Sequence, residues 1–113
     1  MVAHQMDYDD FLKIDIRVGQ IIEVKEFLKA KKPAYQLFID FGDLGIKKSS
    51  AQITDHYSKT DLLRKQVVTI INFRPRQIAN FMSECLVLGI YDSNNKVVIL
   101  QPSDPTKNGY LVL

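Results

Sequence analysis

One segment, residues 72–84 (NFRPRQIANFMSE), sets cationic side chains among aromatic and aliphatic ones at close spacing. It lies between two strongly apolar runs, Val67–Ile71 and Leu86–Ile90, which have the composition of buried strands. A connection between buried strands is normally short and polar, and this one is neither. Guanidinium groups interleaved with apolar side chains can bind single-stranded nucleic acid or an extended polypeptide. The segment therefore predicts a recognition site.

The two arginines of this segment carry the stronger signal. Pro75 fixes its own φ and favours an extended conformation at Arg74. Arg74 and Arg76 are then expected on the same side of an extended chain, because side chains two residues apart share a face. Like charges held close together are unfavourable unless an anion or an aromatic face meets them, so the pair indicates a ligand.

The apolar residues of the segment have a structural alternative. Phe73 and Phe81 could instead plug the open ends of a small barrel, and Ile78 and Met82 could belong to its core. Asn72 could cap the turn, or its amide could contact the backbone or base of a partner. A further basic cluster, which includes Lys32, precedes Pro33 in the connection between the first two expected strands.

Groups suited to catalysis or metal binding are scarce in the sequence. It contains two histidines, His4 and His56, and a single cysteine, Cys85, which lies in an apolar run. These cannot supply the clustered ligands of a zinc site, and a cysteine among apolar neighbours is usually an inert small side chain. Phosphate-binding and dinucleotide-binding motifs are also missing. We therefore expect a binding protein, not an enzyme, without metal or cofactor.

Length and composition predict one soluble domain over residues 1–113, with 46% hydrophobic and 25% charged residues. No apolar run approaches the length that spans a bilayer, so stable membrane insertion is not expected. The acidic N-terminus lacks the pattern of a secretory signal, and one cysteine suits the reducing cytoplasm. Net charge is +2, with basic residues in excess between Leu44 and Tyr91. This excess predicts a positive face, or simply a mixed solvated surface.

The elements that would position the segment are mostly strands, recognised by alternation of apolar and polar residues. Gly19 is expected to mark a bulge or a sharp coil in the first of them. A short helix is expected to begin at Thr54 or Thr60. An apolar tail, 110–113, should be docked on its own barrel or on a second copy. The order is typical of an all-β fold with short helical segments, namely a five-stranded Greek-key barrel of OB type with a C-terminal β extension. The expected strands are 14–25, 35–41, 46–51, 67–73, 85–91 and 96–100, with residues 92–95 (DSNN) expected to turn the chain between the last two.

Several motifs resemble a known family. Residues 11–21 (FLKIDIRVGQI) are similar to the opening strand of the tRNA-binding OB domains, and residues 72–76 with Ser83-Glu84 resemble the motif at their nucleic-acid face. Within that superfamily, three stretches resemble CsaA-type export-associated chaperones. They are 39–42 (IDFG), 45–54 (GIKKSSAQIT), and 72–79 (NFRPRQIA) with 83–89 (SECLVLG).

This resemblance implies a cytoplasmic homodimer that holds unfolded or export-bound precursor polypeptides without ATP, with the export machinery as a further partner. The polypeptide would lie in apolar grooves rimmed by arginine. The implied groove residues are Asn72, Phe73, Arg74, Arg76, Ile78, Phe81 and Met82. The implied dimer contacts are Tyr8, Phe11, Tyr110, Leu111 and Leu113.

The superfamily also implies an alternative, a module that binds tRNA or other RNA. Where tRNA-binding members tend to have Ser-Gly-Ile and Ser-x-Gly-Met, this chain has Ser50-Ala51-Gln52-Ile53 and Ser83-Glu84-Cys85-Leu86. A side chain then occupies a place where backbone would approach RNA closely. The residues implied for RNA binding are Lys32, Lys48, Ser50, Asn72, Arg74, Arg76, Ser83 and Glu84.

Overall fold

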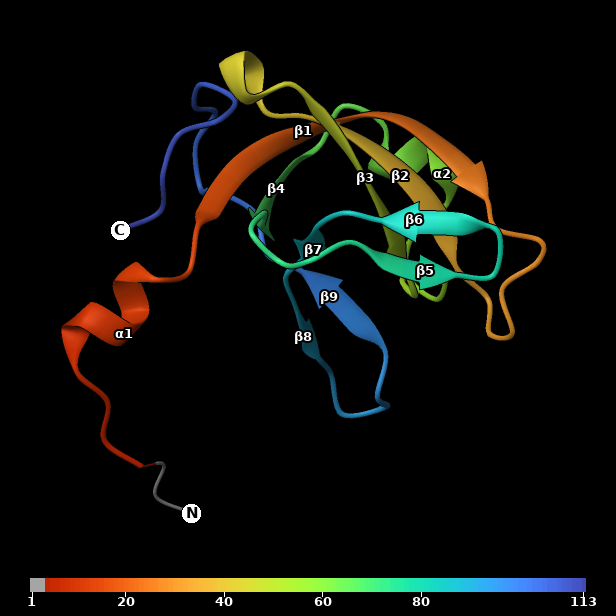
Figure 1. Cartoon of the computed structure of the whole chain (residues 1–113). Helices are drawn as coiled ribbons and strands as arrows, with labels where there is room; N and C mark the ends of the chain where they lie inside the picture. The colour runs from red at the N-terminus through yellow and green to blue at the C-terminus, as the bar shows by residue number, and fades with distance from the viewer. Residues whose placement is uncertain (1–3) are drawn as a thin grey trace.

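Five antiparallel strands, in the order β3-β2-β1-β4-β7, curl around an apolar core (Figure 1). The structure is a computed structural model that describes residues 4–113. Contacts of β3 with β7 bring the two ends of the sheet together, so the expected five-stranded barrel of OB type is confirmed. The strands are β1 Ile16–Glu26, β2 Tyr35–Asp40, β3 Ile46–Ala51, β4 Gln66–Ile70 and β7 Leu86–Val87.

Short helices and two hairpins lie outside the five barrel strands. Helix α1, Tyr8–Leu12, precedes β1 and stands away from the barrel, while η1, Gly42–Leu44, and α2, Lys59–Leu62, lie between strands (Figure 1). Two hairpins complete the chain: β5 Arg76–Ile78 with β6 Phe81–Ser83, and β8 Gly89–Tyr91 with β9 Val97–Ile99. Within residues 4–113, no helix combines the length and the apolar character needed to cross a membrane.

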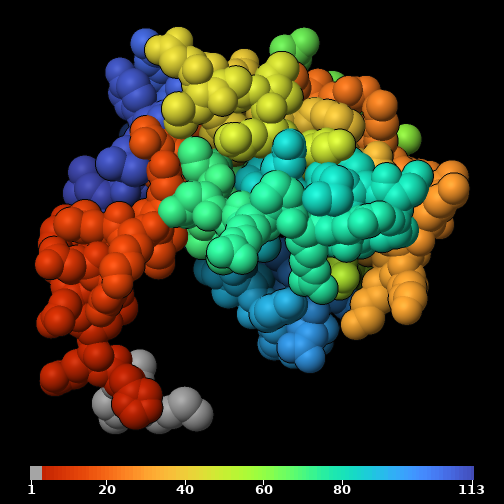
Figure 2. Space-filling view, viewed as in Figure 1, coloured from red at the N-terminus to blue at the C-terminus, as the bar shows by residue number. Residues whose placement is uncertain are grey.

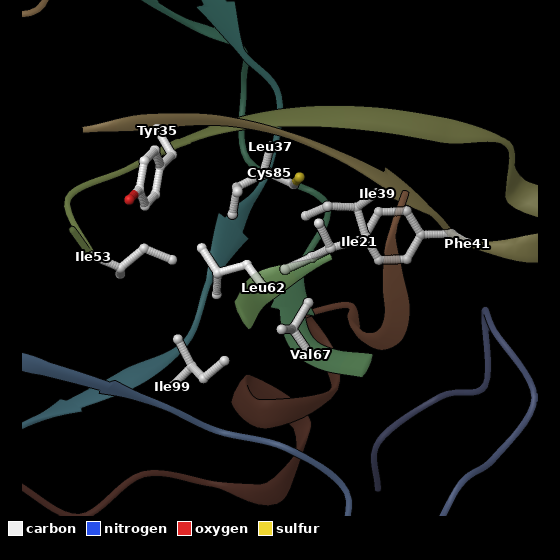
Figure 3. Close-up of a cluster of buried hydrophobic side chains, with 10 residues drawn as sticks. All are labelled: Ile21, Tyr35, Leu37, Ile39, Phe41, Ile53, Leu62, Val67, Cys85 and Ile99. Atoms are coloured by element: carbon white, nitrogen blue, oxygen red, sulfur yellow. The ribbon is translucent and has the colours of Figure 1, made fainter. Parts of the chain in front are cut away.

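Alternation along the strands builds the core. Leu37, Ile39 and Val67 point inward from β2 and β4, with Ile21 from β1, and all four are completely buried (Figure 3). Each such side chain stabilises the fold by about 1.5–3 kcal/mol relative to an exposed position. Leu62 of α2 closes the cluster from one end, and so the short helix acts as a plug.

The bulge in β1 lies at Ile22, not at Gly19. The pairing of β1 with β2 shifts by one residue between Ile21 and Glu23, so the prediction for Gly19 was wrong. Gly19 has a different role, because a Cβ atom there would lie 2.5 Å from Ile39 and 2.6 Å from the Phe41 ring. The missing side chain lets these two core residues pack against the β1 backbone.

Local hydrogen bonds shift several element boundaries from their expected places. The helix begins after Ser58, not at Thr54 or Thr60, because Ser58 Oγ accepts from the Asp61 N–H at 3.1 Å and the Asp61 carboxylate accepts from the Ser58 N–H at 2.9 Å. Strand β4 ends at Ile70, and the expected strand 85–91 divides into β7 and β8. The turn between β8 and β9 forms as expected, with Asp92 Oδ1 accepting from the main chain of Asn94 and Lys96.

The C-terminal tail (residues 101–113) is docked on β1. Gly109 N–H donates to the Val18 carbonyl at 2.7 Å, Val18 N–H donates to the Tyr110 carbonyl at 3.0 Å, and Val112 N–H donates to the Ile16 carbonyl at 2.8 Å. The tail thus occupies the edge of β1 that β2 leaves free, since β2 pairs only from Gln20 onward. The prediction of a docked tail is confirmed.

Candidate functional site

The recognition segment 72–84 folds as a hairpin and not as a loop. It lies across one face of the barrel, in green to cyan, with β3 above it (Figure 2). Strands β5 and β6 pair from Arg76 with Ser83 to Ile78 with Phe81, and a turn at Ala79, with φ of 51°, joins them. Main-chain pairing therefore holds the segment in one conformation before any ligand arrives.

The inner side of the hairpin is packed against the barrel. Phe81 is only 6% exposed, and its ring centroid lies 5.4 Å from that of Phe27 and 6.4 Å from that of Phe38. Ile78 packs half-buried against the same cluster, which is separate from the main core. The prediction that the Phe81 ring faces outward was wrong, because the hairpin folds back and turns this ring onto the β1–β2 region.

The outer side of the hairpin is open to solvent. Phe73 is 54% exposed and Met82 is 41% exposed, and both arginines, Arg74 and Arg76, are exposed beside them. Across residues 4–113, neither arginine has a carboxylate within ion-pairing distance. The hairpin segment thus exposes two of the predicted apolar residues and both guanidinium groups. We call this exposed part of the segment, with Phe73, Arg74, Arg76 and Met82, the candidate face.

Four residues expected to contact RNA instead bind one another, and they attach the hairpin to β3. Ser83 Oγ accepts from the Ser50 N–H at 3.0 Å, and Glu84 Oε1 accepts from the Lys48 N–H at 3.0 Å. The Glu84 N–H donates in turn to the Lys48 carbonyl at 2.8 Å. Ser83 and Glu84 therefore join the end of the hairpin to the outer edge of β3, the edge that faces away from β2.

Asn72 is engaged in a similar way at the other end of the hairpin. Its Oδ1 accepts from the Asp15 N–H at 3.0 Å, and its Nδ2 donates to the Lys13 carbonyl at 2.7 Å. Both ends of the amide thus bind the main chain that connects α1 to β1. The polar group expected to read a ligand is used inside the molecule.

Sequence reasoning missed a pair of lysine–aromatic contacts beside the hairpin. Lys25 Nζ lies 5.2 Å from the centre of the Phe38 ring, and Lys48 Nζ lies 5.0 Å from that of Phe81. Phe38 is half-buried on the outside of β2, where the alternation between buried Leu37 and Ile39 would have placed it. Phe38 and Lys48 thus contact Phe81 on the inner side of the hairpin, and they lie on β2 and β3, the strands that OB barrels use for ligands.

The β1–β2 loop lies next to this surface. Lys32 is exposed there, and a cavity of about 450 Å³ opens beside it, with Phe27, Leu28, Lys31 and Pro33 in its lining. Leu28 is 87% exposed. The loop therefore adds positive charge and apolar surface at the edge of the candidate face.

Cys85 follows the hairpin directly and faces inward. It is buried in the main core, and its thiol lies 3.7 Å from the Lys48 carbonyl. Burial raises the pKa of this thiol to about 12, with the neighbouring Glu84 carboxylate adding to the effect. A thiol with so high a pKa is a poor nucleophile at neutral pH. In the part of the chain that the structure describes, no cluster of three or more metal-binding side chains occurs.

The residues expected at a dimer contact gather at one side of the molecule, away from the hairpin tip. Tyr8 on α1 is 69% exposed, and Tyr110, Leu111 and Leu113 of the tail are 56%, 57% and 98% exposed. Phe11 is half-buried, and its ring centroid lies 6.0 Å from that of Tyr8. Together α1 and the tail enclose an open cavity of about 390 Å³ lined by Tyr8, Phe11, Leu111 and Leu113 among others. We call this region the assembly surface.

Comparison with known proteins identifies the family. Residues 16–110 match the family described as putative tRNA binding domain. The methionine–tRNA ligase of Parabacteroides distasonis is 33% identical over 108 residues, which are 96% of this chain and 16% of that enzyme. The chain thus spans a small part of the length of such relatives.

Two solved structures match over nearly the whole of both chains. The chaperone CsaA of Bacillus anthracis is 44% identical, with a TM-score of 0.92 over 97% of this chain and 100% of that one. The CsaA chaperone protein of Picrophilus torridus is 50% identical, with a TM-score of 0.91 over 96% and 100%. The chain therefore belongs to the tRNA-binding domain family, and its likeness to these two proteins makes it a CsaA-type member of that family.

Proposed function

We propose that this protein is a cytoplasmic, ATP-independent chaperone that holds unfolded or export-bound precursor polypeptides on the outer side of the 72–84 hairpin. One observation carries the proposal: the hairpin segment exposes Phe73 and Met82 together with Arg74 and Arg76, and the two arginines have no carboxylate partner among residues 4–113. The two CsaA relatives, both described as chaperones, support the same function.

Binding would be passive and would need neither a catalytic residue nor a cofactor. Apolar client side chains would cover Phe73 and Met82, while the guanidinium groups of Arg74 and Arg76 would donate hydrogen bonds to client carbonyls or carboxylates. Since only the unfolded client exposes such segments, binding stabilises the unfolded form by mass action and delays folding. The export machinery is the partner that would receive such a client.

The proposal includes a homodimer built on the assembly surface. Tyr8 and the tail residues Tyr110, Leu111 and Leu113 expose apolar area next to one another, and a second copy would cover it. A two-fold axis would repeat the candidate face, so that a client with two exposed segments gains from both.

A second candidate function is binding of tRNA or other RNA. It is favoured by the two arginines of the hairpin together with Lys25 and Lys48, which lie over the rings of Phe38 and Phe81. Family membership points to the same ligand. Single-stranded bases could stack on Phe73 while the basic groups meet phosphates.

The two functions differ in their response to salt. Purified protein would be titrated with a denatured precursor and with bulk tRNA at about 50 and 200 mM salt. Holding through an apolar surface predicts micromolar polypeptide binding that changes little with salt, whereas phosphate contacts predict RNA binding that weakens steeply. If neither partner binds at low micromolar concentration, both proposals are wrong.

A further inference from the structure

Asn72 lies where the hairpin segment, proposed to bind a ligand, meets the connection between α1 and β1, which belongs to the assembly side of the molecule. It is the first residue of the hairpin segment, and it lies against the connection between α1 and β1. Three hydrogen bonds join the two: the pair made by its amide with Lys13 and Asp15, and one from the Ile71 N–H to the Asp15 carbonyl at 2.9 Å. The root of the hairpin is thereby tied to the arm (residues 8–15) that carries α1.

Little else fixes the direction of the arm. No residue of α1 is fully buried, Phe11 is half-buried, and the helix has only five residues, Tyr8–Leu12, so packing alone fixes its orientation weakly. Its last turn ends at Lys13, whose carbonyl is the acceptor of the Asn72 amide. The hydrogen bonds of Asn72 to the arm therefore determine the angle at which the arm leaves the barrel.

The same connection also reaches the tail. Asp15 forms an ion pair with Arg17 at 2.6 Å, and Arg17 Nη1 donates to the Gly109 carbonyl at 3.1 Å. Asn72, Asp15 and Arg17 all contribute to the lining of the cavity between the arm and the tail. A polar network at the base of this cavity thus holds both apolar parts of the assembly surface in one arrangement.

We propose that Asn72 is a positioning residue for assembly, which sets the arm for contact with a second copy of this chain, and that it does not itself bind a ligand. The inference rests on the proposed homodimer. Binding two ordered surfaces avoids the entropy cost of fixing a free arm at the moment of association. Removing the Asn72 amide leaves the exposed apolar residues in place but allows the arm to sample other directions, so the dimer weakens.

The test compares Asn72→Ala with wild type by sedimentation over a wide range of protein concentration. Each protomer loses two hydrogen bonds, and we expect the dimer dissociation constant to rise about tenfold or more. Asn72→Asp keeps an acceptor for the Asp15 N–H and loses the donor to the Lys13 carbonyl, so it should also weaken the dimer. This variant is used in place of Asn72→Ala if the alanine variant does not fold. Gln77→Ala is the matched control, because this exposed hairpin amide donates only to the nearby Ala79 carbonyl.

Ligand binding separates positioning from direct contact. At a protein concentration where Asn72→Ala is fully dimeric, its affinity for tRNA and for the denatured precursor should equal that of wild type. A loss of affinity that persists in the dimer would overturn the inference, as would an unchanged dimer dissociation constant. Wild-type protein that sediments as a monomer would overturn the homodimer itself, which is a separate result.

Discussion

Phe73 and Phe81 belong to one hairpin segment, yet they meet opposite environments. Phe73 at the root is 54% exposed, whereas Phe81 after the turn is 6% exposed and contacts Phe27 and Phe38. One ring is available to a partner and the other anchors the hairpin to the barrel. The same residue type, eight positions apart, thus serves recognition in one place and stability in the other.

The largest expected effect is on stability. Phe81→Ala should lower the free energy of unfolding by about 3 kcal/mol, because it leaves a cavity in the aromatic cluster. Phe73→Ala should change it by about 0.5 kcal/mol, as is usual for an exposed residue. Urea unfolding monitored by circular dichroism measures both. Equal losses in the two variants would show that the difference between the rings is not energetic.

The rate at which Cys85 is labelled gives an independent test of the difference between Phe73 and Phe81. With a thiol pKa of about 12, only ~10⁻⁴ of the group is thiolate at pH 8, so reaction with a thiol reagent should require opening of the hairpin side of the barrel. Phe81→Ala should accelerate labelling, and Phe73→Ala should leave the rate as in wild type.

The next effect is on binding. Arg74→Ala with Arg76→Ala should reduce RNA affinity by about tenfold and lower the slope of its salt dependence by about two, one for each phosphate that an arginine no longer neutralises. Phe73→Ala should weaken polypeptide binding more than RNA binding. A matched control removes two exposed lysines outside the hairpin, Lys59 and Lys96. If this control reduces RNA affinity equally, the effect reflects net charge and not the candidate face.

The smallest expected effect is on the hydrogen bond between Ser83 and Ser50, which attaches the hairpin to β3. Ser83→Ala leaves the Ser50 N–H without its acceptor and should cost about 1 kcal/mol of unfolding free energy. Ser83→Thr retains the hydroxyl and should restore most of the stability. RNA binding by the folded alanine variant should stay unchanged, because Ser83 is occupied by β3; a selective decrease in RNA binding would return Ser83 to the set of residues that touch the ligand.

Much of the fold could be predicted because alternation is a strong signal. The strand around Leu37 and Ile39, the polar strand β3 and the turn at Asp92 all formed as expected. The type of barrel also followed from the order of the elements along the chain. The bulge at Ile22 could not be predicted, since it depends on which residue of β2 each residue of β1 meets.

The candidate site was predicted less well, for a physical reason. The segment was recognised, but the side on which each residue lies depends on the hairpin register, which a one-residue slip reverses. Asn72, Ser83 and Glu84 were expected to bind a ligand, and the structure uses their polar groups within the chain. A polar side chain in a sequence motif does not reveal whether its partner is another molecule or a strand far away in the same one.

The docked tail also has a consequence for biosynthesis. Gly109–Val112 supplies the main-chain hydrogen bonds along one edge of β1 at Ile16–Val18. This part of β1 therefore lacks its partner until a segment more than ninety residues later in the chain has been made. Until that segment leaves the ribosome, the nascent chain carries an open strand edge, which can pair with other chains. Pairing between such distant segments also slows folding. A protein proposed to hold unfolded chains is therefore itself exposed to the same hazard until residues 109–112 have been made.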